Sequence, residues 1–376
     1  MKWLRERWLW ALGGLVLVIW AGVAVLAWKA MRAPLGKPIT YPTYTPTTEA
    51  ATPTNPPAQE TGMAPTPSPV LGSETAAATP TQEAVATAPP SPTPARGLCG
   101  GPAKMDILII GGRTGIDDNA DVIRIVRVDF VKPEVRVVPI PRDLVVELPE
   151  DFLQRTKLGS PVKFASISVI GSPSWDPEAD RSGGARLAAQ TLDKNFGIRV
   201  DHYIAIDGLS FDNFINDIGG INVYLPYPIQ DPDQNANFPA GWLHLDGHDA
   251  LLLARIRSDV GELGRIERQH MIVKAILQKI VSDPHTLARL PSIINRYRQR
   301  VVTSLSVQEI AQLLCLFTHL DPEKEIVMYP PPRELFRSDN EAQIYVGPDP
   351  AKAYGMYWDE RYVQWLHDAL EGRIRP

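Results

Sequence analysis

The spacing of apolar and polar residues predicts a domain of mixed helices and strands from about residue 100 to the end of the chain. Short apolar or β-branched runs predict strands at 105–111, 121–129, 134–140, 202–206, 221–225 and 325–329, the second and third joined through Lys132-Pro133 as a hairpin. Apolar residues at helical spacing predict helices at 182–195, 209–218, 248–254, 264–281, 290–297, 307–317 and 360–370. Strands and helices mixed in this way are typical of a three-layer α/β domain.

A long apolar run lies near the start of the chain. No charged residue interrupts residues 8–28 (WLWALGGLVLVIWAGVAVLAW), about the length that a helix needs to cross a bilayer. Trp8 and Trp28 at its ends fit the aromatic anchoring of a membrane interface. The run is longer than the apolar core of a cleaved signal peptide. We therefore expect a transmembrane helix at 8–28 after a cytoplasmic segment at 1–7.

The segment after this run is poor in apolar side chains. Pro, Thr and Ala dominate residues 38–95, with four Glu and no Lys or Arg, so this stretch buries too little apolar surface to offset its ordering entropy. The sequence predicts a disordered, Pro/Thr-rich extracellular linker over 29–99; the alternative is a disordered cytoplasmic linker. A domain at 100–283 follows, and 284–376 continues it.

Composition narrows the class of partner. The formal net charge of −5 argues against nucleic acid, which usually requires a strongly basic face. The chain has two cysteines, Cys99 and Cys315, and neither has the spacing of a metal site. An extracellular location would allow a disulfide between them, a pairing that the sequence leaves open.

A cluster of cationic residues is the strongest candidate for chemistry. Arg255 and Arg257 alternate, so both point to one side of an extended segment. Arg265 and Gln269 are four apart and share one face of a predicted helix. Converging guanidinium groups suit a phosphate, and a diphosphate above all. The alternative is a set of surface arginines paired with carboxylates.

Two further segments could join this cluster. The loop 111–121 follows the first predicted strand, and its glycines and aspartates could approach phosphate and Mg²⁺; the alternative is a hydrophilic turn. Arg142, at the end of another strand, is either a phosphate ligand or the partner of Asp143. Asp246 is predicted to cap the helix that leads to Arg255.

Taken together, several segments resemble the LytR-CpsA-Psr family of cell-wall glycopolymer transferases over about residues 105–282. They are ILIIG (107–111), Ala120-Asp121, IPRD (140–143), GGARLAAQTL (183–192), GIRVDHYIAID (197–207), DIGGINVYLP (217–226), AGWLHLDGHDALLLARIRSD (240–259) and GRIERQ (264–269). So many segments in the family's order are far more specific than any single arginine.

The resemblance implies a three-layer α-β-α domain with a mixed central sheet, preceded by one transmembrane helix and a linker. It also implies a Mg²⁺-dependent phosphotransferase at the cell membrane, which moves a glycopolymer from an undecaprenyl-diphosphate carrier to peptidoglycan or another envelope acceptor. The polyprenyl tail would lie in a hydrophobic groove. By position, the diphosphate ligands would be Arg142, Arg255, Arg257, Arg265 and Gln269. Asp121 would bind the metal or act as base, so Asp121 and Arg255 are the expected catalytic residues.

The loop around Asp121 departs from the family pattern. Arg113 stands where the family usually has an aspartate, and Asn119 where it has an arginine. Ala120 and Val122 replace the serine and threonine beside Asp121, and an arginine often found just after the IPRD segment is missing. Asp117 or Asp118 could replace the lost carboxylate.

Exchanging a carboxylate for a guanidinium should weaken metal affinity. Three hypotheses follow: an active transferase, a glycolipid-binding module without turnover, and an envelope tether whose linker is the functional part.

Overall fold

The computed structural model describes residues 29–42, 97–257, 261–297 and 299–376. The predicted transmembrane segment at 8–28 and most of the predicted linker lie outside the described residues. Within the described ranges, none of the helices combines the length and the apolar character that a membrane crossing requires.

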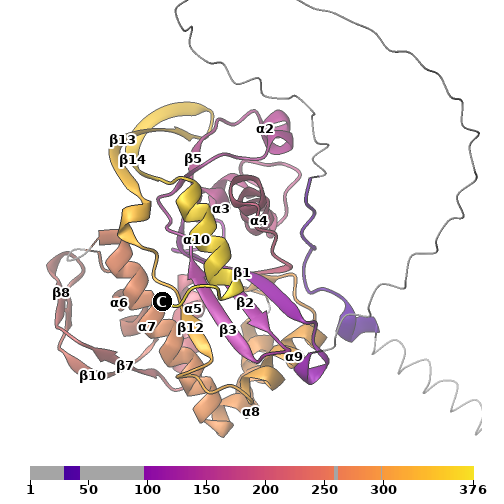
Figure 1. The fold of residues 1–376 in the computed structure, drawn as a ribbon, viewed down its shortest axis with the longest axis vertical. Coiled ribbons are helices and arrows are strands. Elements are labelled where there is room, and N and C mark those ends of the chain that lie inside the picture. Colours follow the sequence, from indigo (N-terminus) through magenta and orange to yellow (C-terminus); the bar gives the residue numbers. More distant parts are fainter. Residues whose placement is uncertain (1–28, 43–96, 258–260, 298) are drawn as a thin grey trace, which may run out of the picture. The chain divides into compact units, whose positions relative to one another are not determined.

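A six-stranded mixed sheet lies at the centre of the fold (Figure 1). Its strands, in spatial order, are β11 (Val302–Thr303), β6 (His202–Asp207), β1 (Lys104–Gly112), β2 (Ala120–Asp129), β3 (Glu134–Pro139) and β12 (Ile326–Met328). The pairs β1–β6 and β3–β12 are parallel, and the other neighbours are antiparallel. The mixed central sheet implied by the resemblance is confirmed, as is the hairpin of β2 and β3.

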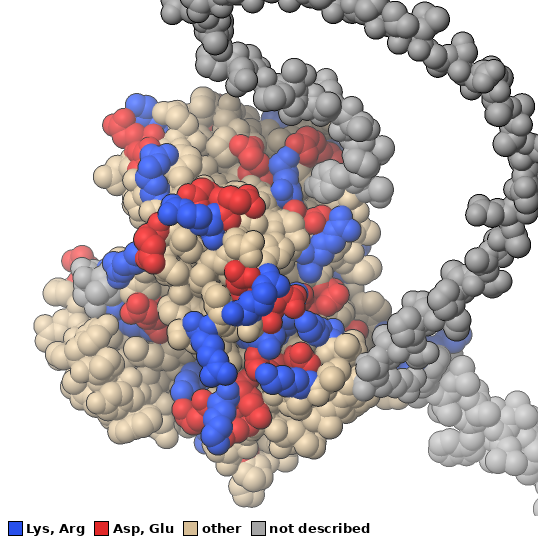
Figure 2. Space-filling model, viewed as in Figure 1, with Lys and Arg blue, Asp and Glu red and all other residues tan. Residues whose placement is uncertain are grey.

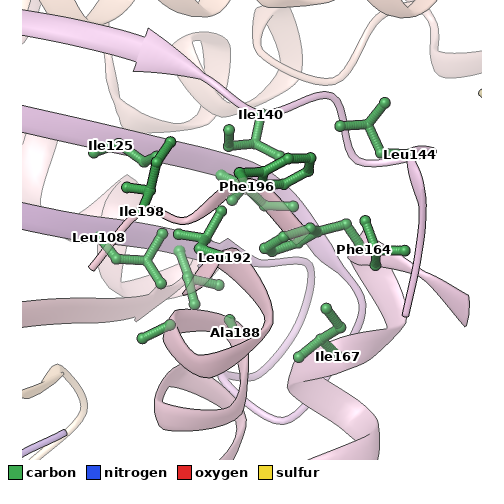
Figure 3. Close-up of a cluster of buried hydrophobic side chains, with 14 of the residues drawn as sticks. Leu108, Ile125, Ile140, Leu144, Phe164, Ile167, Ala188, Leu192, Phe196 and Ile198 are labelled. Carbon is green, nitrogen blue, oxygen red and sulfur yellow. The ribbon is translucent and has the colours of Figure 1, made fainter. Parts of the chain in front are cut away.

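Helices cover both faces of this sheet because its strands alternate apolar side chains between the faces. On one face Leu108 packs against Leu192 of α4, in the cluster drawn in Figure 3, and α10 joins the same cluster. On the other face Ile107 packs in a cluster with Leu316 of α9. The helices concerned are α4 (Gly183–Phe196), α9 (Val307–Phe317) and α10 (Glu360–Glu371). This arrangement has the three layers that the sequence predicts.

A second apolar cluster lies beside the sheet. It joins a two-stranded antiparallel sheet to the helices around it. Its elements include α5 (Gly208–Asp217), β7 (Ile221–Leu225), β10 (Gly241–Leu245), α6 (Gly247–Leu253), α7 (Gly261–Ser282) and α8 (Pro284–Tyr297). The helix expected at 290–297 thus begins six residues earlier, with Pro284 in its first turn, where a missing N–H costs nothing.

Several elements have no counterpart in the sequence predictions. The largest is an antiparallel hairpin of β13 and β14, most of whose side chains are exposed. The elements are η1 (Leu98–Gly100), β4 (Val145–Val146), α2 (Glu150–Thr156), β5 (Val162–Lys163), η2 (Phe164–Ser166), α3 (Ile167–Ile170), β8 (Ile229–Asp231), η3 (Pro232–Gln234), β9 (Ala236–Phe238), η4 (Arg333–Leu335), β13 (Arg337–Val346) and β14 (Asp349–Tyr357). Most of them are too short, or too exposed, for their apolar residues to show the periodicity of a helix or a strand.

Residues 29–42, which the sequence assigned to the linker, contact the domain. The hydroxyl of Tyr41 donates to the carbonyl of Val200 at 2.7 Å, and the backbone N–H of Leu35 donates to Leu305 at 3.1 Å. The prediction of a disordered linker from residue 29 therefore does not describe this part, because its few apolar and aromatic side chains find partners on the domain.

Cys99 and Cys315 form a disulfide with a Cα–Cα distance of 6.0 Å. The bond joins η1 to α9 across 216 positions of sequence. The pairing that the sequence left open is therefore present, and it ties the start of the domain to a helix that covers the central sheet.

Candidate functional site

Asp121 lies at an irregularity between β1 and β2. Gly111 pairs with Val122 and Gly112 pairs with Ala120, so Asp121 has no opposite residue on β1. An extra residue of this kind bends a strand and redirects its side chain. Asp121 is only 8% exposed, so its carboxylate requires cationic or hydrogen-bonding partners.

Arginines surround this carboxylate. Among the described residues, five have a side-chain nitrogen within 3.8 Å of an Asp121 carboxylate oxygen: Arg113, Arg142, Arg255, Arg257 and Arg265. Arg142 and Arg257 approach Oδ1, as does Arg265 at 3.4 Å. The other two approach Oδ2, each with its Nε at 3.8 Å. The predicted cationic cluster therefore exists, and it centres on the predicted acidic residue.

The positions of Arg255 and Arg257 follow from the end of α6. The carboxylate of Asp246 caps this helix by accepting from the backbone N–H of Asp249 at 2.9 Å, as predicted. Beyond the helix Ile256 is fully buried, so the residues on either side of it point the other way, toward Asp121. The alternation expected from the sequence is confirmed.

A glycine lets Arg255 approach the loop after β1. Its Nη2 donates to the backbone carbonyl of Arg113. A Cβ atom at Gly208 would lie 2.5 Å from that nitrogen and 2.7 Å from that carbonyl oxygen. A larger residue at this position would therefore displace the guanidinium.

Arg265 and Gln269 share one face of α7, as predicted, and both reach Asp121. The amide of Gln269 donates to the backbone carbonyl of Ala254 at 3.0 Å and to that of Asp121 at 3.3 Å. Its side-chain oxygen accepts from Arg124 at 2.6 Å. Gln269 therefore positions the two segments that carry the site, and its contact with a diphosphate stays a prediction.

Two charged residues near the site were not singled out from the sequence. Arg124 lies in β2 and is 2% exposed. The sequence feature that could have identified it is an arginine inside a β-branched run, because a cation buried in a strand requires a partner. Glu262 accepts from Arg265 at 2.6 Å, and it also accepts from the backbone N–H of Arg142 at 3.4 Å. Arg142 itself pairs with Asp121, whereas Asp143 pairs with Lys163 at 3.3 Å, so the alternative of a local Arg142–Asp143 pair is wrong.

The five arginines of the cluster carry more positive charge than the carboxylates beside them can neutralise. Burial, together with the neighbouring guanidinium groups of Arg265 and Arg142, lowers the pKa of Arg257. Burial also lowers the pKa of Arg255, and nearby Arg113 acts in the same direction while Asp121 opposes it. The Nε atoms of Arg142, Arg255 and Arg265 have no hydrogen-bond partner among the described residues. Unused donors and uncompensated charge at one place suit a bound anion.

The donor set does not fit Mg²⁺, which takes most of its ligands from carboxylates, phosphates and water. Asp121 is surrounded by guanidinium groups, and Glu262 is joined to it through Arg265 rather than directly. In the loop after β1, Asp118 accepts from the backbone N–H and the hydroxyl of Thr114. That loop therefore has the hydrogen bonding of a hydrophilic turn, the alternative that the sequence left open. Among described residues, the geometric metal-ligand group is Cys99, Cys315 and His319, whose cysteines form the disulfide.

An apolar cavity of about 910 Å³ lies near this cluster. Side chains from β1, β6, α8 and α9 line it, and so do residues 35–37. They include Ile109, Ile204, Ile206, Leu290, Ile294 and Leu313. Its volume and lining suit a long hydrocarbon chain.

The cavity and the arginine cluster adjoin at the end of β6. Ile206 lines the cavity, and two residues later Gly208 abuts the guanidinium of Arg255. Arg181 also lines the cavity, and its charge acts on Asp117 in the loop after β1, although burial raises the pKa of that aspartate overall. One ligand with an apolar tail and an anionic head could therefore occupy both.

The family follows from a sequence model of the LytR_cpsA_psr family, which matches residues 78–350. The chain belongs to the LytR_cpsA_psr family. Curated relatives include a Bacillus subtilis protein named polyisoprenyl-teichoic acid–peptidoglycan teichoic acid transferase TagV, which is 25% identical over 56% of this chain and 51% of its own length. The Corynebacterium glutamicum cell wall biosynthesis protein LcpA is 28% identical over 54% of this chain and 40% of its own length. The chain thus spans about half the length of these relatives.

Solved structures of the family share the fold. The crystal structure of B. subtilis TagV has a TM-score of 0.52 and 22% identity, over 72% of this chain and 96% of that one. A structure of TagT bound to LIIa-WTA has a TM-score of 0.53 and 18% identity, over 72% of this chain and 90% of the other. At these identities the likeness concerns the fold.

Proposed function

We propose that this protein is a membrane-anchored extracellular phosphotransferase that moves a glycopolymer from an undecaprenyl-diphosphate carrier to peptidoglycan or another envelope acceptor. The observation that carries the proposal is the cluster of five arginines at Asp121, next to an apolar cavity of about 910 Å³. An anionic head and a long apolar tail are the two parts of such a carrier. Relatives named as teichoic acid transferases support the choice of reaction.

The extracellular location has its own support. The disulfide between Cys99 and Cys315 suits an oxidising compartment. On the face drawn in Figure 2, lysine and arginine side chains lie beside aspartate and glutamate side chains. A mixed surface of this kind differs from the basic stripe typical of nucleic-acid binding.

The arginine cluster can bind the diphosphate and favour its cleavage. Guanidinium groups would donate to the non-bridging oxygens and neutralise the negative charge that repels an attacking hydroxyl. Arg255 and Arg257, held on one side of the chain by buried Ile256, would bind the same group. Because the donors already converge before the ligand arrives, little reorganisation is needed.

The proposed reaction exchanges the phosphoanhydride bond of the diphosphate for a phosphate ester bond to the acceptor. The acceptor hydroxyl oxygen forms a bond to the phosphorus that carries the glycopolymer. The bond between that phosphorus and the bridging oxygen breaks, and polyprenyl phosphate leaves with the electron pair. The hydroxyl proton passes to a base, and Asp121 is the carboxylate placed to accept it.

A glycolipid-binding module without turnover is the second candidate. Arg113, 3.8 Å from Asp121, favours it, because a guanidinium stands there in place of the aspartate that the family usually has at this position. Under this alternative the site would hold the carrier lipid and release it unchanged. The hypothesis of an envelope tether assigns the function to the linker, so the arginine cluster and the cavity do not support it.

The decisive experiment uses the full chain in detergent with a polyprenyl-diphosphate glycan and peptidoglycan fragments. Polyprenyl phosphate release, together with sugar attached to the acceptor, would support transfer; binding without release would select the module. Arg255→Ala should weaken either activity by about tenfold or more, because one charge-assisted contact is lost. Arg289→Ala, an exposed arginine of α8, is the matched control and should change nothing.

A further inference from the structure

We propose that Arg113 takes the place of a divalent cation, so that this site binds a diphosphate group without metal. The inference rests on the proposed function only in its choice of ligand. It follows from the failure of the donor set to fit Mg²⁺ and from the position of one guanidinium.

The backbone of Arg113 is fixed on two sides. Its N–H donates to the carbonyl of Asn119 at 3.3 Å, which closes the loop after β1. Its own carbonyl accepts from Arg255. The residue is therefore placed by the strand pair and by the loop after α6.

The side chain of Arg113, in contrast, can reach a ligand. It is 56% exposed, whereas the other members of the cluster are more buried, down to 1% for Arg265. Its Nε lies 3.8 Å from Oδ2 of Asp121, a distance that leaves the guanidinium without a close hydrogen bond to that oxygen. A phosphate oxygen arriving from solvent would meet this group at the open side of the cluster.

Charge favours the guanidinium over a metal ion here. A divalent cation beside Asp121 would face five positive groups within a few ångströms and a single directly opposed carboxylate. A diphosphate group is negatively charged, so the five guanidinium groups would attract it and the single carboxylate would repel it. Arg113 supplies planar donors to non-bridging oxygens, so it replaces both the charge and the ligand contacts that a metal would provide.

The test measures binding directly. The full chain in detergent would be titrated with farnesyl diphosphate and, separately, with inorganic pyrophosphate, each in EDTA and in millimolar Mg²⁺. We expect binding of both in EDTA, with no gain on adding Mg²⁺. Binding that appears only with Mg²⁺ would overturn the inference and leave the proposed function intact. An absence of farnesyl diphosphate binding in both buffers would overturn both.

Two substitutions at Arg113 test whether its guanidinium is responsible for metal-free binding. Arg113→Ala should weaken binding in EDTA by roughly tenfold or more, the effect of losing a charge-assisted hydrogen bond. Arg113→Asp should weaken it further and make it improve with Mg²⁺. Mn²⁺ alone, followed by its electron spin resonance signal, should bind Arg113→Asp more tightly than the wild-type chain. Equal Mn²⁺ binding by the two proteins would contradict the proposal, and Arg289→Ala should behave as wild type throughout.

Discussion

The guanidinium of Arg124 donates to the side-chain oxygen of Gln269 at 2.6 Å, and both side chains are almost completely buried. Burial lowers the pKa of Arg124, and the charge of nearby Arg265 acts in the same direction. The hydrogen bond is therefore an important compensation for a buried cation. It also links β2, which carries Asp121, to α7, which carries Arg265.

Gln269→Leu should lower the free energy of unfolding by about 2–4 kcal/mol, because it removes a hydrogen-bond acceptor from the buried guanidinium of Arg124. Urea unfolding followed by circular dichroism would measure the loss. Gln364→Leu, at an exposed glutamine of α10, is the control and should change stability little. Equal stabilities of the two variants would show that the Arg124–Gln269 contact is dispensable.

Asp121→Asn should remove the charge that holds the arginine cluster together. Mutual repulsion of the guanidinium groups would then destabilise the fold by about 3 kcal/mol at low ionic strength, and added pyrophosphate should restore much of this. Transfer should be lost while anion binding is kept or tightened. Thermal unfolding with and without pyrophosphate is the measurement, and a variant as active as wild type would exclude Asp121 as the base.

Arg257→Ala should weaken the binding of a polyprenyl diphosphate by about ten- to a hundredfold, because one charge-assisted contact is lost. Titration at several salt concentrations should also show a shallower salt dependence than for the wild-type chain, since fewer cations contact the ligand. An unchanged affinity would place the diphosphate elsewhere.

Ile294→Trp should fill part of the apolar cavity from its α8 side. Affinity for a long-chain polyprenyl diphosphate should then fall by about tenfold, which is the effect of losing one or two buried methylene contacts, while inorganic pyrophosphate binds as before. Ser292→Trp, at an exposed position of the same helix, is the control. Parallel losses for both ligands would mean that the cavity does not hold the tail.

His270 should make stability depend on pH. Burial lowers its pKa to about 3, so the folded protein keeps the imidazole neutral while the unfolded chain binds a proton below about 6.5. The unfolded state binds more protons, so stability is complete above pH 6.5 and falls as the pH drops toward 3. The loss should be about 2 kcal/mol between pH 6.5 and 5. Urea unfolding across this range should show a smaller slope for His270→Gln; identical slopes would assign the dependence to other groups.

The sequence could predict the elements that have one strongly apolar face. Leu108 and Ile110 on β1, or Ala188 and Leu192 on α4, are buried and recur at the expected spacing. β13 is different, because most of its side chains are exposed and its buried apolar face consists of Ala342 and Ile344, too few to establish a period. Its pairing with β14 depends on backbone hydrogen bonds that no composition reports.

The site was predictable in its members but only in part in its geometry. Converging arginines could be expected from alternation and helical spacing. The approach of Arg113 to Asp121 could not, because it depends on the pairing of β1 with β2 and on the extra residue in β2. Arg124 was overlooked for a related reason, since its role comes from a partner 145 positions away.

The attachment of residues 29–42 to the domain changes what the Pro/Thr-rich segment can do. Tyr41 is hydrogen-bonded to Val200, and Leu98 is hydrogen-bonded to Phe130. Gly97 is likewise hydrogen-bonded to Gly101, so the residues on both sides of 43–96 contact the same domain. The number of residues between these two attachment points therefore does not set how far the domain can lie from residue 29. With residues 8–28 in a membrane, Leu35 at the cavity is seven residues from the anchor, at most about 25 Å of extended chain. If the chain is anchored as we propose, shortening residues 43–96 would therefore not change how near the domain can lie to the lipid surface, where a carrier could enter the cavity with its tail still partly in the bilayer.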